Sequence, residues 1–151
     1  MQTAYIKPVG GLKRVAVVPA GTTVADSPQE IASQVVALPL MEDGSVYEEI
    51  LQSEDGVLIV CHRLTLTLAR DVAQREVTER VAVAWSREGT AALVETLSGE
   101  RLIVGWSERW QHEQPLRLVK MESTTALSPA EIPTARLIFE SYDDSSAQSL
   151  T

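Results

Sequence analysis

Several features are scarce in this chain, and each shortage excludes a class of protein. The single cysteine, Cys61, excludes an intrachain disulfide, which fits a reducing compartment. The longest unbroken apolar runs, such as Val57 to Cys61, fall far below the ~20 residues of a membrane-spanning helix. The apolar run from Val15 to Val18 is too short for a signal peptide. We therefore expect a soluble, cytoplasmic protein with no membrane partner.

Basic residues are also scarce. The 13 lysines and arginines are outnumbered by 21 aspartates and glutamates, which gives a formal net charge of −8. Nucleic-acid phosphates are held by clustered positive charge, so no specific nucleic acid is expected as a partner. No lysine or arginine occurs from Val15 to His62, where acids are frequent. This stretch is either a solvated acidic loop that keeps the protein soluble or an electronegative face that pairs with a basic patch on a neighbour.

Motifs for catalysis and ligand binding are missing as well. The two histidines, His62 and His112, lack the spacing of a zinc site. Cys61 and His62 are neighbours in an apolar run that reads as a strand, so their side chains point to opposite faces and form no dyad. Cys61 is expected to be a small buried apolar residue. With no glycine-rich phosphate loop or nucleophile elbow either, we expect no enzyme, no catalytic residue, no metal and no cofactor.

The strongest pattern that is present is a long strand over residues 56–68. Its apolar residues at even positions share one face by the period of two: Leu58, Val60, Leu64, Leu66 and Leu68. The other face begins with Val57 and Ile59 and ends polar, so the first half of the strand is apolar on both faces. Such a strand begins in a core or in an interface and ends beside solvent.

The remaining elements form a β-rich chain with one helix. Residues 71–82 have the apolar spacing of a short amphipathic helix with Asp71 as its N-cap. Strands are predicted at 15–18, 35–40, 90–97, 100–106, 116–121 and 135–142, with hairpin turns at Asp55-Gly56 and at the two-residue loop Ser98-Gly99. This pattern predicts a mainly β (α+β) fold: an antiparallel β-sandwich or small barrel with one flanking helix.

The ends of the chain lack such patterns. Residues 1–12 are expected to be a loosely held lead-in, and residues 143–151 a disordered tail behind a single domain over 1–142. Trp85, Trp106 and Trp110 are interpreted as core or interface residues in preference to a stacking platform.

Four features follow one another along most of the chain: the strand 56–68, the helix 71–82, the tight hairpin at Ser98-Gly99 and a late strand, 134–142, behind a proline-containing loop. In this layout the chain resembles the tail-tube family of bacteriophages and related contractile injection systems. The resemblance implies a sandwich or barrel whose copies stack as rings and which has no catalytic residue. We therefore expect a phage or prophage virion protein of tail type, cytoplasmic before assembly, that forms a homo-oligomer and contacts other virion proteins. Tail-terminator, head–tail completion and baseplate proteins of such particles are further possibilities.

The predicted interface lies in and beside residues 42–55, a segment with six acids and no base. Its apolar residues, together with two from the following strand, are the candidate interface residues: Val46, Tyr47, Ile50, Leu51, Val57 and Ile59. The segment is expected to be mobile in the monomer and to dock on an adjacent subunit, although 46–52 also fit a strand. Its acids are expected to pair with arginines such as Arg75 or Arg87.

An alternative function is binding without assembly. A β-barrel with the same elements would hold a small apolar ligand or a protein partner, with the helix 71–82 as a lid. A closed interior cavity would distinguish this ligand-binding barrel from a ring subunit, which should have a filled core and an apolar outer patch.

Overall fold

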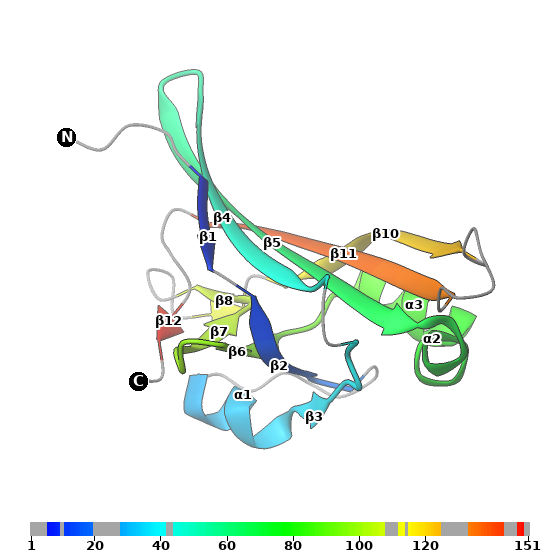
Figure 1. Cartoon of the computed structure of the whole chain (residues 1–151). Coiled ribbons are helices and arrows are strands. Elements are labelled where there is room, and N and C mark those ends of the chain that lie inside the picture. Colours follow the sequence, from blue (N-terminus) through cyan, green and yellow to red (C-terminus); the bar gives the residue numbers. More distant parts are fainter. Residues whose placement is uncertain are drawn as a thin grey trace.

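The protein is an open sandwich of two antiparallel sheets (Figure 1). The computed structural model describes residues 6–9, 11–19, 28–41, 44–107, 112–113, 115–124, 133–143 and 148–149. Within these residues the two main sheets have five strands each and do not close into a barrel. The predicted mainly β sandwich is therefore confirmed, and the barrel form is not found.

Sheet A is the larger sheet and contains the long predicted strand. Its order is β1 (Ile6–Val9), β4 (Val46–Glu54), β5 (Val57–Ala69), β11 (Thr134–Asp143) and β10 (Arg117–Thr124). The strands β5, β10 and β11 confirm the predictions at 56–68, 116–121 and 135–142. The prediction of a loose lead-in is wrong at residues 6–9, because β1 pairs with β4.

Sheet B is built from shorter strands. Its order is β12 (Gln148–Ser149), β7 (Arg101–Val104), β6 (Ala92–Thr96), β2 (Leu12–Val17) and β3 (Val36–Ala37). Helix α1 (Pro28–Gln34), which the sequence pattern did not predict, contacts β6 and β7. A separate two-stranded sheet joins β8 (Trp106–Ser107) to β9 (His112–Glu113). At residues 148–149 the structure has a paired strand where a disordered tail was expected.

The hairpin between β6 and β7 forms where the turn signal predicts it, but with a longer loop. The Thr96 amide donates to the Glu100 carbonyl at 2.9 Å, and the Gly99 amide donates to the Thr96 carbonyl at 3.0 Å. These two bonds enclose Leu97, Ser98 and Gly99, so the loop has three residues, not the predicted two.

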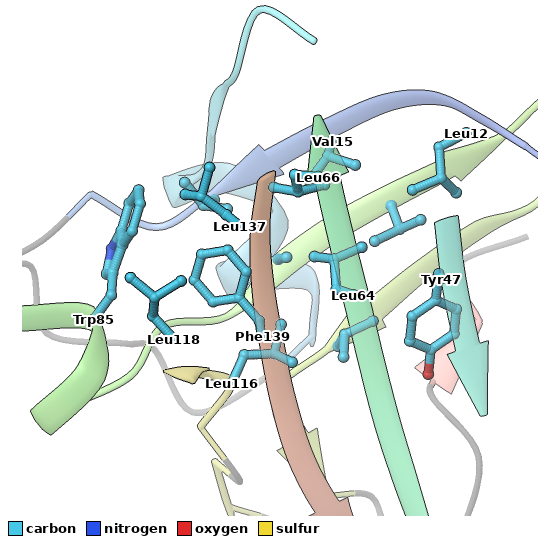
Figure 2. Packing of buried hydrophobic residues seen from close by; sticks show 14 of the residues in the cluster. Leu12, Val15, Tyr47, Leu64, Leu66, Trp85, Leu116, Leu118, Leu137 and Phe139 are labelled. Atoms are coloured by element: carbon cyan, nitrogen blue, oxygen red, sulfur yellow. The ribbon is translucent and has the colours of Figure 1, made fainter. Parts of the chain in front are cut away.

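The core lies between the inner faces of the two sheets (Figure 2). Leu64 and Leu66 of β5 and Phe139 of β11 are fully buried and belong to one cluster with Val15 of β2 and Val94 of β6. These residues come from alternate strand positions, because successive side chains point to opposite faces. Each fully buried side chain of this kind contributes about 1.5–3 kcal/mol.

One end of the core is closed by two helices where one was predicted. Helices α2 (Arg70–Glu76) and α3 (Glu79–Arg87) are separated at Thr78, which has extended backbone angles and caps α3 by accepting a hydrogen bond from the Val81 amide at 3.4 Å. The predicted N-cap, Asp71, lies inside α2. Trp85 of α3 is buried and meets Phe139 edge-on, with ring centroids 5.6 Å apart. The helices therefore contribute side chains to the core.

Tyr47 is part of the core, although the sequence placed it in the interface. It has no exposed surface, its ring lies edge-on to His62 with centroids 6.2 Å apart, and its hydroxyl donates to Glu49 Oε2 at 2.8 Å. Tyr47 pairs with Leu64 across β4 and β5, and directly paired residues share a face, so this register turns its ring toward the core.

The position of Tyr47 generates a stability prediction. Tyr47→Ala should lower the free energy of unfolding by about 3–5 kcal/mol, the usual cost of removing a buried aromatic ring. Val57→Ala is the control, because an exposed side chain changes stability by only about 0.5 kcal/mol. Urea unfolding of both variants measures the difference. Equal, small losses would show that Tyr47 is not a core residue.

Candidate functional site

The candidate site is the hairpin that joins β4 to β5. Its loop is Asp55-Gly56, and both residues have positive φ, 52° and 81°, as a type I′ turn requires. The strands pair without interruption from Glu54 opposite Val57 to Val46 opposite Thr65. The turn predicted from the Asp-Gly pair is confirmed. The mobile-loop prediction is wrong for residues 46–54, which form β4, whereas residues 42–43 lie outside the described residues.

The far half of this hairpin extends beyond the rest of sheet A (Figure 1). Strand β1 pairs with β4 only up to Ile50, and β11 pairs with β5 only up to Val60. Residues 51–59, here called the hairpin tip, therefore pair only with each other in the part of the chain that the structure describes. An isolated two-stranded ribbon is at best marginally stable in water, so the tip gains from any partner that covers it.

The hairpin tip exposes apolar side chains on both of its faces. Val57 is 60% exposed and Leu58 is 56% exposed, and as neighbours on a strand they point to opposite faces. Leu51 and Ile59 are half-buried beside them. The tip also contains two acids, of which Asp55 is exposed in the turn. A projecting apolar surface of this kind is typical of an interaction site.

Below the tip, the outer face of sheet A continues the apolar surface. Ile50, Cys61 and Tyr142 form one row across β4, β5 and β11, and Tyr142 remains about half exposed. The next row contains an ion pair in which Arg63 Nε lies 2.9 Å from Glu140 Oε2. The hydrogen bond to Glu140 raises the pKa of Arg63 further, so the guanidinium stays charged at physiological pH. The apolar surface is therefore bounded by a fixed pair of charges.

The structure brings most of the predicted interface residues together. Leu51, Val57 and Ile59 lie in the hairpin tip, and Ile50 lies at its base. Val46 is half-buried at the opposite end of β4, and Tyr47 belongs to the core. Arg75 and Arg87, the predicted partners of the acids, lie on α2 and α3 at the opposite end of sheet A (Figure 1).

Leu58 and Tyr142 were missed by the sequence reasoning. Leu58 has the same even-position pattern as the core leucines of β5, so periodicity alone assigns it to the core. The signal that could have identified it is length. Strand β5 has 13 residues, whereas strands in globular proteins usually have about 5–6. A strand this long must extend past a sandwich made of shorter ones.

Of the three tryptophans interpreted as core or interface residues, Trp85 is the one whose side chain the structure describes. Trp85 is in the core, as expected. Trp106 lies in β8, and Trp110 lies outside the described residues. His62 is buried, as is Cys61, which confirms the thiol as a small buried residue.

The burial of Cys61 generates a reactivity prediction. The thiol is 1% exposed, and burial, helped by the carboxylate of Glu140, raises its pKa. A raised pKa lowers the thiolate fraction at any given pH, and the thiolate is the reactive form. Burial also blocks access of the reagent, so alkylation by iodoacetamide should be slower in the folded protein than in urea by on the order of tenfold or more.

The control for this measurement is the double variant Cys61→Val/Val119→Cys, which moves the thiol to an exposed position of β10. That thiol should react at nearly the same rate with and without urea. If native Cys61 reacts as fast as the relocated thiol, then the Cys61 thiol is accessible to solvent from the outer face of sheet A and is not buried.

The comparisons and the described residues assign no other site. Among the described residues, no group of histidine, cysteine and acidic side chains is placed to hold a metal ion. No helix in the same residues combines the length and apolar character needed to cross a membrane. A scan against protein-family models, a search of curated proteins and a search of solved structures found no match to this chain.

Proposed function

We propose that this protein is a structural, non-enzymatic subunit that self-assembles through its hairpin tip, as a tail-type virion protein of a phage or prophage. The observation that supports self-assembly is the two-faced apolar ribbon over residues 51–59. Covering an exposed Val or Leu side chain is worth about 1.5–3 kcal/mol, and a closed or repeating array gains this at every copy.

A comparison between two parts of sheet A supports the proposal. The edge strand β10 has a register shift between Leu118 and Lys120 and an ion pair between Lys120 and Glu122. Bulges and charges are the usual means by which an edge strand avoids pairing with another chain. The hairpin tip lacks a comparable bulge, because its register is continuous. The hairpin tip is therefore the part of sheet A best suited to contact another subunit.

The order of elements supports the assignment to a virion. The long strand β5, the helices α2 and α3, the β6–β7 hairpin and the late strand β11 follow one another as in the tail-tube layout. The cluster of buried apolar side chains between the sheets fits a ring subunit better than a ligand-binding barrel. The virion assignment rests on this layout, whereas self-assembly rests on the tip.

The proposal predicts an assembly defect without a folding defect. Val57→Ser/Leu58→Ser removes the exposed apolar groups on both faces of the tip and should increase the dissociation constant of the assembly by at least about 100-fold, equal to 2.7 kcal/mol. Sedimentation velocity over a concentration series, with electron microscopy of the concentrated sample, measures this loss. In dilute, monomeric samples, the circular dichroism spectrum and the Tm should stay close to those of the unmodified chain.

The matched control is Val119→Ser, which removes an apolar side chain of similar exposure, 55%, from β10, the edge strand with the bulge and the ion pair. It should assemble as the unmodified chain does. An unmodified chain that stays monomeric at every concentration would overturn the proposal, as would a Val119→Ser defect equal to that of the tip variant.

A further inference from the structure

A groove lies beside strands β2 and β3 of sheet B. It has a volume of about 350 Å³, is open to solvent, and is lined by Leu12, Lys13, Arg14, Leu38, Leu40 and Leu97 among others. An open groove of this size suits the side chains of a docked chain segment.

The groove combines an apolar floor with positive charge at its rim. Leu12 is buried, Leu38 and Leu40 are half-buried, and Leu97 projects from the β6–β7 loop with 70% of its surface exposed. Lys13 and Arg14 are both exposed. The Glu95 carboxylate lies 4.0 Å from Arg14 Nε, which is a loose contact. An occupant of this groove should therefore be apolar and acidic.

We infer that the groove receives the hairpin tip of a second copy of this chain. The tip offers the complementary chemistry: exposed Val57 and Leu58 beside the acids Glu54 and Asp55. In the complex, Val57 or Leu58 covers the leucine floor, and the exposed Asp55 faces Lys13 and Arg14. This inference rests on the proposed self-assembly and names the surface that the tip contacts.

The positions of the two surfaces make the contact intermolecular. In Figure 1 the hairpin tip is at the top of the molecule, and β2 and β3 are at the bottom. One chain therefore cannot fill its own groove with its own tip. A contact between two different surfaces of the same protein is heterologous, so it repeats from copy to copy and produces a ring or an open filament.

The test exchanges the charges of the two surfaces. Lys13→Glu/Arg14→Glu makes the groove acidic, and Glu54→Lys/Asp55→Lys makes the tip basic. Each pair alone places like charges together and should weaken assembly by roughly tenfold or more. The chain that contains all four substitutions again has opposite charges across the contact and should assemble close to the original level. Sedimentation velocity at fixed salt measures all three variants.

Mixing the two charge-reversed chains gives a second readout. The acidic groove of the Lys13→Glu/Arg14→Glu chain fits the basic tip of the Glu54→Lys/Asp55→Lys chain. The unchanged basic groove of the second chain fits the unchanged acidic tip of the first. The mixture should therefore assemble, although each chain alone does not. The matched control, Arg75→Glu/Arg80→Glu, changes the net charge equally on the exposed surface of α2 and α3. It should assemble normally.

The outcomes separate the two proposals. If the acidic-groove variant assembles normally while Val57→Ser/Leu58→Ser does not, the tip contacts another surface and the inference is wrong, but the proposed function stands. An assembly defect in the Arg75/Arg80 control equal to that of the groove variant would also overturn the inference, because general repulsion would explain both. An unmodified chain that never assembles overturns both proposals.

Discussion

The pairing of β5 with β4 on one side and with β11 on the other is the interaction on which the structure depends. Both pairings are antiparallel and continuous, and they include nearly the whole length of β5. Because side chains alternate along a strand, a slip of one residue would turn Leu64, Leu66 and Leu68 from the core to solvent. The register therefore fixes the core, and the core in turn fixes where the helices, the groove and the hairpin tip lie.

The same constraint accounts for the hairpin tip. The alternation that buries Leu64 and Leu66 continues to Leu58, but the described strands of sheet B do not extend that far (Figure 1), so Leu58 is exposed. The tip is thus a continuation of the core pattern into solvent. Among the described residues this arrangement leaves a pair of strands without neighbours and exposes apolar side chains, which natural edge strands usually avoid. Its presence is understandable if another copy of the chain supplies the missing cover.

The sequence predicted the elements whose signals are local. The Asp55-Gly56 turn and the strands β5 and β11 follow from turn chemistry and a period of two, and each was found. Elements determined by distant contacts were not predicted. Strand β1 exists because β4 offers it an edge, and Tyr47 is buried because it pairs with Leu64. The break at Thr78 was missed because an apolar helical period continues through it. Of the site, Leu51, Val57 and Ile59 were predicted, whereas the exposure of Leu58 depends on where sheet B ends.

The proposed self-assembly requires that another copy of the chain covers the hairpin tip. Hydrogen–deuterium exchange of the unmodified protein, measured in dilute and in concentrated solution, tests it without any substitution. Backbone amides at 51–59 should exchange quickly in the dilute monomer and become protected with rising concentration, while amides of the β5 core half stay protected in both. Rapid exchange at 51–59 in a sample that has assembled would contradict the account, because the assembly would then be held by another surface.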